Sequence, residues 1–202
     1  MAKLIRRDQI VDDEWTLVRF PAREEPVRKQ AGKPVLFKLT GEASASSDDI
    51  AALDIPAGKV IVPLPVWLAR KEELAARLAE GSLGVWIDSH ESPEALAESV
   101  ADLNCFSVIA VNFPRFIDGR GYSIGALLRT RYGFRGELRA VGDVLRDQLF
   151  YLKRCGFDAY AVAPQKNIEE ALGGLRDFSE PYQGAVDQPL PLFRRRAHSL
   201  AN

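Results

Sequence analysis

The segment with the clearest chemical character is FPRFIDGRGYS, residues 113–123, which places two arginines and two glycines before a predicted helix over residues 123–132. Backbone N–H groups at a helix start, together with arginine guanidinium groups, can bind an oxyanion. The candidate anion-binding or partner-binding residues in this segment are Arg115, Arg120, Gly121 and Tyr122. Asp118 lies among them and is a candidate catalytic proton carrier.

The basic character continues beyond this segment. Residues 113–154 contain nine basic and four acidic residues, a net charge of +5, which suits an anionic ligand or an acidic partner protein. Arg139 and Arg154 extend the same predicted basic face. The alternative is that the arginines form structural salt bridges with nearby carboxylates, at Asp118, Asp143 and Asp147.

Cys155 ends a predicted helix in the sequence RCGFD. The helix C-terminus raises a thiol pKa while the neighbouring Lys153 and Arg154 lower it, so the two influences oppose each other. Cys155 is kept as a candidate redox thiol, with a small buried structural residue as the alternative. The second cysteine, Cys105, is 50 residues away in apolar surroundings, and no CxxC pair supports a disulfide framework or a thiolate metal cluster.

Two other loops carry titratable side chains. Asp143 follows a predicted strand and is the second candidate proton carrier, and His90, beside Asp88, could act as an acid–base group or half of a metal site. No glycine-rich phosphate loop, GxSxG elbow or GxGxxG motif follows the first predicted strand, so nucleotide hydrolysis and dinucleotide-dependent dehydrogenation lack their usual sequences. No metal site is predicted, and any cofactor stays unknown.

A regular alternation of short apolar runs and amphipathic segments positions these residues. The predicted strands begin near Lys59, Leu83, Ser107, Glu137 and Asp158. This pattern predicts an α/β fold of about five parallel βα units, arranged either as an incomplete (β/α) barrel or as an open doubly wound sheet. In both arrangements ligands bind beyond the carboxyl ends of the strands, where the candidate loops lie.

Three helices have marked ends. The first spans residues 67–79, with an apolar stripe that includes Leu68, Leu74 and Ala75, and it ends at Gly81. The second begins at the N-cap Ser92 with Pro93 in its first position, and its buried stripe runs on to residue 103. The third follows Asp143 as the N-cap and ends at Gly156.

The whole chain, residues 1–202, is expected to form a single domain. Residues 1–34 form an N-terminal β-arm and loop, in which the cluster Asp12-Asp13-Glu14 is the predicted hairpin turn. Residues 59–178 form the βα core, and residues 182–202 form a tail that is either a docking strap or a loose end. The arm could pair with a second copy, so a homodimer is possible.

The composition narrows the class of protein. Hydrophobic residues make up 47% of the chain and the formal net charge is −1, values that indicate a globular protein and exclude a nucleic-acid-coating protein. The apolar runs are too short to cross a membrane and the N-terminus has no export signal, so a cytoplasmic location is expected.

The blocks FPRFIDGRGYS, GELRAVGDVLRDQL and RCGFDAY resemble the bacterial domain-of-unknown-function 934 family over about residues 59–165. The resemblance implies a role in assimilatory sulfate reduction, because genes of this family commonly lie beside those of sulfite reductase. It also implies the label of probable oxidoreductase, which leaves open whether the chain is an enzyme. The family's recurrent polar positions include Asp118, Arg120, Arg139, Asp143, Arg154 and Cys155.

Three functions follow from these observations. The first is an accessory or electron-transfer-associated protein of sulfite reduction that docks through its basic face to sulfite reductase or to the electron donor of that enzyme. The alternative is a small oxyanion-binding enzyme that uses Arg115, Arg120 and the helix start, with Cys155 as a redox thiol. The third is a purely structural interaction protein.

Overall fold

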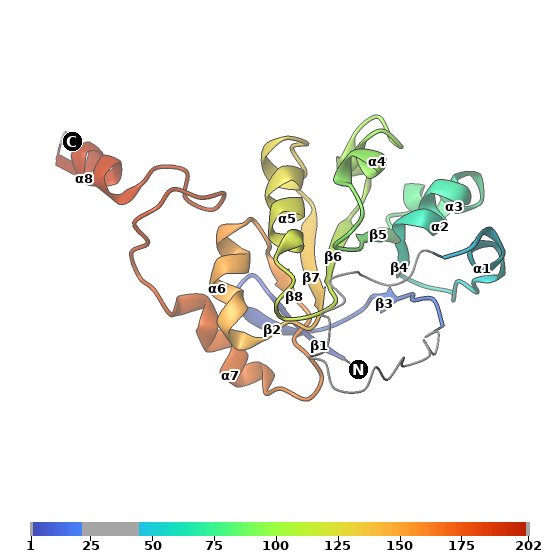
Figure 1. The fold of residues 1–202 in the computed structure, drawn as a ribbon, viewed down its shortest axis with the longest axis horizontal. Coiled ribbons are helices and arrows are strands. Elements are labelled where there is room, and N and C mark those ends of the chain that lie inside the picture. The colour runs from blue at the N-terminus through green and yellow to red at the C-terminus, as the bar shows by residue number, and fades with distance from the viewer. Residues whose placement is uncertain (1, 22–44, 201–202) are drawn as a thin grey trace, which may run out of the picture.

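The computed structural model describes residues 2–21 and 45–200, and it contains an eight-stranded mixed sheet with helices packed on it (Figure 1). The strands are β1 (Lys3–Arg6), β2 (Gln9–Asp12), β3 (Thr16–Leu17), β4 (Val60–Pro63), β5 (Leu83–Ile87), β6 (Val108–Phe113), β7 (Glu137–Gly142) and β8 (Ala159–Tyr160). Their order across the sheet is β2-β1-β8-β7-β6-β5-β4-β3. Most of the predicted N-terminal loop, residues 22–34, lies outside the described residues.

The sheet confirms the α/β class and corrects its details. The five predicted strands correspond to β4 through β8, each beginning at the expected residue or one residue later. The sheet is mixed, however, because β1 runs antiparallel to β8 and a sixth parallel strand, β3, extends the other edge. Neighbouring parallel strands follow one another in chain order, without the order reversal of a doubly wound sheet, and the sheet curls into a half-barrel.

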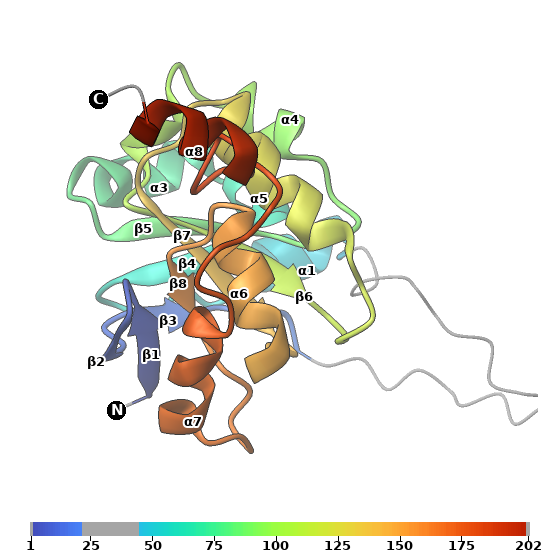
Figure 2. The same ribbon diagram turned by 90° about the vertical axis from the view of Figure 1, so that its left-hand side faces the viewer.

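The helices are α1 (Ser47–Ala52), α2 (Leu64–Ala69), α3 (Lys71–Ala79), α4 (Pro93–Ala97), α5 (Arg120–Thr130), α6 (Arg146–Arg154), α7 (Ile168–Gly173) and α8 (Leu192–Leu200). Two 3₁₀ turns are η1 (Leu103–Cys105) and η2 (Gly174–Arg176). Helices α5 and α6 lie side by side on the sheet (Figure 2), joined by a ring contact between Tyr122 and Tyr151.

Four helix predictions need correction. The helix predicted over residues 123–132 begins and ends earlier, as α5 spans Arg120–Thr130. The predicted helix over residues 67–79 breaks at Arg70, whose backbone leaves the helical region, so that Leu68 is exposed while Leu74 is buried. The helix after Ser92 has the predicted N-cap and first-position proline but ends at Ala97, and a separate 3₁₀ turn carries Leu103. The third helix begins at Arg146 rather than directly after Asp143.

The N-terminal hairpin is present, but its turn is not the acidic cluster. The turn residues are Arg7 and Asp8, and both have positive φ angles, of 47° and 65°. Within this cluster Asp12 is the last residue of β2, and Asp13 and Glu14 lie on the link from β2 to β3, two strands at opposite edges of the sheet. Only three residues span this link, so the sheet must curl until its two edges approach each other.

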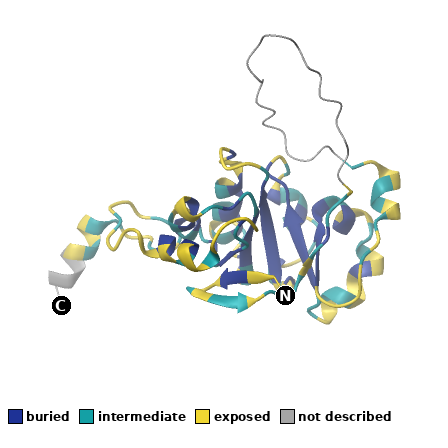
Figure 3. Cartoon of the chain, turned by 90° about the horizontal axis from the view of Figure 1, so that it is seen from below, coloured by how far each residue is buried: buried dark blue, intermediate teal, exposed yellow. Residues whose placement is uncertain are grey.

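The core lies on both faces of the curled sheet. Strands β4, β5 and β6 are buried along their whole length (Figure 3), as expected for parallel strands covered on both sides. One face packs against the helices. The inner face carries a smaller apolar cluster of Ile61, Trp86, Val108, Ala110 and Val141, against which Trp15 and Leu17 pack.

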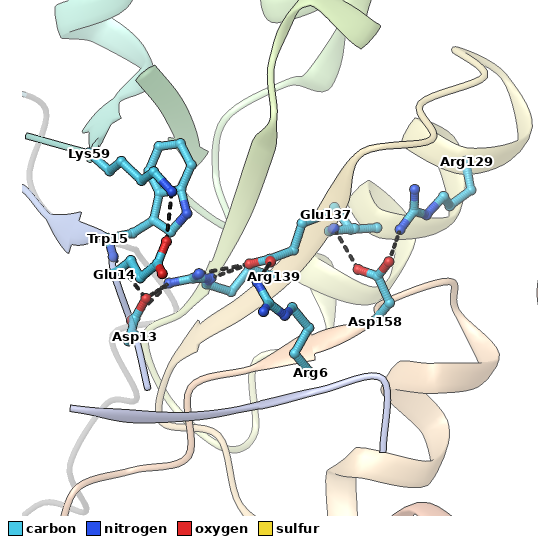
Figure 4. Close-up of polar contacts among 10 residues, drawn as sticks. Arg6, Asp13, Glu14, Trp15, Lys59, Arg129, Glu137, Arg139 and Asp158 are labelled. Atoms are coloured by element: carbon cyan, nitrogen blue, oxygen red, sulfur yellow. Dashed lines mark hydrogen bonds and ion pairs between the residues drawn. The ribbon is translucent and has the colours of Figure 1, made fainter. Parts of the chain in front are cut away.

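An ionic network joins the β2–β3 link to the amino ends of the parallel strands (Figure 4). The guanidinium of Arg139, on β7, contacts both oxygens of Asp13 at 2.9 Å and Glu137 at 2.7 Å. On the same link, Glu14 pairs with Lys59 at 2.6 Å. The amino end of the half-barrel is therefore closed by charge pairs.

The C-terminal segment is docked at one point and then leaves the body. Arg154 binds the carboxylate of Asp187 at 2.7 Å and the carbonyl oxygen of Gln183, and its own carbonyl oxygen accepts the Val186 N–H. Helix α8 lies apart from the sheet at the end of this segment (Figure 1). In the predicted tail, residues 182–202, these contacts with the body involve Gln183, Val186 and Asp187. No helix in the described part of the chain has the length and apolar character needed to cross a membrane.

Candidate functional site at the carboxyl ends of the strands

The carboxyl end of the parallel sheet holds a buried polar cluster. Seven polar or charged residues are buried in the described part of the chain, and four of them gather here. They are Asp88, Ser89, Asn112 and Asp118. Asp88 and Ser89 follow β5, Asn112 lies near the end of β6, and Asp118 belongs to the loop between β6 and α5.

Hydrogen bonds connect these four residues in one chain. Arg19 donates to the Asn112 side-chain oxygen at 3.0 Å, and the Asn112 amide donates to Asp88 at 3.0 Å. Asp88 also accepts the Ser89 N–H at 2.7 Å, and the Ser89 hydroxyl donates to Asp118 at 2.7 Å. Because the cluster is buried and bonded throughout, it fixes the segment after β5 and the β6–α5 loop relative to the end of β6.

Asp118 is held as a carboxylate. Arg120 binds it with its side chain at 2.6 Å and 2.9 Å and with its backbone N–H at 3.1 Å. The side-chain hydrogen bond from Arg120 is the largest cause that lowers the Asp118 pKa, to about 2. Asp118 is therefore ionised at neutral pH, and the predicted role of a proton carrier does not fit this environment.

The start of α5 is occupied by the chain itself. Asp118 accepts the N–H of Arg120, the first residue of the helix, and so takes the place that an external oxyanion would need. Packing, rather than anion binding, explains why residue 121 is a glycine, because a Cβ there would lie 2.6 Å from the Phe113 ring. The salt-bridge alternative is correct for the pair Arg120 and Asp118.

Asp143 holds the base of the same loop. One oxygen of its carboxylate accepts the Phe116 N–H at 2.8 Å, and its own N–H donates to the Phe113 carbonyl oxygen at 2.7 Å. Gly142 has a φ of 99°, and a Cβ at that position would lie 2.4 Å from the same Phe113 oxygen. The predicted N-cap role of Asp143 is wrong: Gln148 accepts the Leu145 N–H at the start of α6.

The loop tip between these anchors is exposed. Arg115 is exposed and its side chain makes no hydrogen bond or ion pair within the described part of the chain, while Phe116 and Ile117 have 43% and 54% of their surface exposed. The sequence pattern predicts Arg115 as a site residue, whereas Phe116 and Ile117 are not among the predicted site residues. Their signal was present, as an apolar pair inside an otherwise polar and glycine-rich loop.

Only some of the residues on the predicted basic face are exposed. Arg139 and Arg154 are only 2% and 5% exposed, and both are engaged in ion pairs within the chain. Arg129 likewise binds Asp158, and Arg146 binds Asp177. Arg139 and Arg154 are therefore structural residues that do not reach a partner, which corrects the prediction that placed them on a docking surface.

Cys155 is a buried thiol at the end of α6. Burial is the largest influence on it and raises the thiol pKa, although a hydrogen bond with Tyr151 lowers it. The thiol is mostly protonated at neutral pH, so the structure favours the structural alternative over a reactive thiolate. Cys105 is exposed and lies in η1, which precedes β6, whereas Cys155 precedes β8, so both cysteines lie at the amino ends of the parallel strands.

Tyr122 and His90 lie near the cluster without joining it in one reactive arrangement. The Tyr122 ring packs between Phe113 and Tyr151, and burial raises the pKa of its hydroxyl. His90 Nδ1 lies 3.4 Å from Asp88. Among residues 2–21 and 45–200, no three side chains of the metal-binding types lie close enough together to hold an ion.

Comparison with known proteins gives one match, to a family model. The family model described as bacterial protein of unknown function (DUF934) matches residues 84–193, more than half of the chain. A search of curated proteins and a search of solved structures give no significant match. The matched range contains the loop tip, its anchors Asp118 and Asp143, and the buried Arg139 and Arg154. The chain belongs to this bacterial family of unknown function.

Proposed function

We propose that the protein is an accessory factor of assimilatory sulfite reduction that docks, through the tip of the β6–α5 loop, to sulfite reductase or to its electron donor. The docking surface is defined here as Arg115, Phe116 and Ile117. The sulfur-pathway part of the proposal rests on the family resemblance and its gene neighbourhood. The docking part rests on the geometry of this loop.

One structural feature supports docking most directly. The exposed tip of the β6–α5 loop is held in place by residues that are buried and hydrogen-bonded. Two large apolar side chains and an arginine without an internal partner are exposed side by side in the chain. Directly below them, Asp143 and Gln148 hold the backbone of Phe116, and Asp118 is buried. A preformed loop loses little conformational entropy on binding, and arginine with aromatic residues is typical of binding hot spots.

The charge of the tip indicates the chemistry of the partner surface. Asp118 is neutralised by Arg120 and Asp143 is turned inward to the Phe116 backbone, so Arg115 is left as the unmatched charge of the tip. The complementary surface is therefore an apolar pocket flanked by a carboxylate. This differs from the broad basic face expected from sequence, because most arginines of that segment are already paired.

Binding to purified sulfite reductase tests the docking surface. We expect the Phe116→Ala and Arg115→Glu variants each to weaken binding by about thirtyfold, the scale of a hot-spot residue. Leu68→Ala and Arg135→Glu are the matched controls, because they change an exposed leucine and an exposed arginine elsewhere. Equal affinity for the loop variants and the controls would contradict the docking surface.

Growth of a strain that lacks the gene tests the pathway independently. We expect the deletion strain to grow on sulfide but not on sulfate or sulfite. The normal gene and the Arg135→Glu variant should restore growth, and the Arg115→Glu variant should restore it only weakly. Normal growth of the deletion strain on all three sulfur sources would contradict the pathway while leaving the binding experiment to decide on the docking surface.

A further inference from the structure

A groove of about 380 Å³ lies at the other end of the sheet, within the size range of small-molecule sites. It is formed by the β1–β2 turn, the end of α6 and the docked part of the C-terminal segment. Its lining includes Arg7, Phe157, Tyr160 and Val186, together with three carboxylates described below.

The floor of the groove is apolar. Phe157 and Tyr160 are each 2% exposed, and the Tyr160 hydroxyl donates to the Phe157 carbonyl oxygen at 2.7 Å. Because this hydroxyl is already bonded, the tyrosine contributes its ring rather than a free polar group. Val186 closes one side from the C-terminal segment. Such a floor suits an aromatic or aliphatic ligand body.

The charges around the groove are balanced except for one. The three carboxylates are each paired with a cation of the chain: Asp8 with Lys153 at 3.5 Å, Asp158 with Arg129 at 3.3 Å (Figure 4), and Asp187 with Arg154 at 2.7 Å. The remaining lining cation is Arg7, which is exposed and makes no side-chain hydrogen bond or ion pair with the described residues. Burial raises the pKa of the Asp158 carboxyl and Arg7 acts electrostatically to lower it, but Arg7 is the lining cation without a direct side-chain partner among the described residues.

The backbone conformation of Arg7 is also unusual for an arginine. A two-residue hairpin turn with positive φ at both positions favours Asn and Gly, yet this turn carries Arg and Asp, with φ of 47° and 65°. A hydrogen bond from the Arg7 N–H to the Asp158 carbonyl oxygen, at 3.0 Å, holds the turn over the groove. The chain thus accepts a less favourable turn residue in the position that places a guanidinium at the rim.

We propose that this groove binds a small apolar molecule with a single carboxylate, whose body packs on Phe157 and Tyr160 and whose carboxylate pairs with Arg7. The site lies at the amino end of β8, away from the loop tip that carries the docking surface. It also spans the body and the C-terminal segment, so the bound ligand contacts both through Tyr160 and Val186.

Nuclear magnetic resonance titration of the full chain tests the site, with 3-phenylpropanoate and benzoate as the probes and benzamide as the uncharged control. We expect saturable shifts of the amide signals of Gly156 and Val186 with at least one carboxylate, and binding of benzamide at least about tenfold weaker. The absence of saturable shifts with both carboxylates would overturn the proposal.

The Arg7→Asn variant separates binding from folding. Asparagine tolerates a positive φ, so the turn is retained or stabilised while the guanidinium is removed. We expect carboxylate binding to weaken by about tenfold or more in Arg7→Asn and to stay unchanged in the control Arg135→Gln. A second variant, Val186→Phe, should block the groove. Unchanged binding in Arg7→Asn, or an equal loss in Arg135→Gln, would overturn the assignment.

Discussion

Arg139 and Asp13, 126 positions apart in the sequence, meet at 2.9 Å on the inner face of the half-barrel. Arg139 is 2% exposed and lies on β7 in the centre of the sheet, whereas Asp13 lies on the short link between the two edge strands. The pair therefore ties the link that joins the two edges to the middle of the sheet. Glu137 binds the same guanidinium and completes its charge compensation.

Removing the Asp13 carboxylate should destabilise the fold. In Asp13→Asn the buried guanidinium keeps Glu137 but loses its second carboxylate, and a charged hydrogen bond of this kind is worth about 2 kcal/mol. Urea unfolding measures the change. The control is Asp12→Asn, an exposed neighbour, which should change the free energy of unfolding by less than about 0.5 kcal/mol. Similar values for both variants would show that the buried pair is not important for stability.

Gly142→Ala should be more costly than Gly133→Ala. Both glycines have positive φ, but a Cβ at Gly142 would meet the Phe113 carbonyl oxygen at 2.4 Å, whereas a Cβ at Gly133 has nothing within 4 Å. We expect a loss of about 1 kcal/mol for Gly133→Ala, from backbone strain alone, and about 3 kcal/mol for Gly142→Ala. Chemical denaturation compares them. Equal losses would mean that the contact with Phe113 relaxes freely.

Asp118 should make stability depend on pH in the acid range. Its pKa is lowered from 3.8 to about 2 in the folded state, so its ionisation stabilises the fold above the unfolded pKa, and this contribution is lost as pH falls toward the folded pKa. The contribution is about 2 kcal/mol at neutral pH. Between about pH 5 and about pH 3, the stability difference between the normal protein and Asp118→Asn should fall by about half. A constant difference would contradict the lowered pKa.

The two cysteines should react with alkylating reagents at different rates. Cys105 is exposed, whereas Cys155 is buried and burial raises its thiol pKa. Iodoacetamide followed by mass spectrometry should therefore modify Cys105 first, and modify Cys155 at a comparable rate only after unfolding. Cys155→Ser should also rescue growth of the deletion strain. Fast modification of Cys155 in the native protein would revive the redox-thiol hypothesis.

The sequence pattern predicts the strands and helix ends that are determined by residues close together in the chain. The five strand starts were found because parallel strands, buried on both faces, are short continuous apolar runs, as in Val60–Pro63 and Val108–Phe113. Ser92 and Pro93 were found because a helix N-cap acts within a single turn. The hairpin turn was missed because Arg7 and Asp8 lack the Asn-Gly signal, while the acidic cluster that follows resembles a turn in composition.

The α/β class, the parallel strands and the loops at their carboxyl ends, including the segment that carries Arg115, can therefore be predicted from the sequence. Which of the charged side chains in this segment can reach a partner depends on the tertiary structure. Arg139 and Arg154 are indistinguishable from Arg115 in the sequence, yet their partners Asp13 and Asp187 come from distant segments that only the curled sheet and the docked C-terminal segment bring to them. A charge pair depends on distance in space, and sequence spacing does not specify that distance.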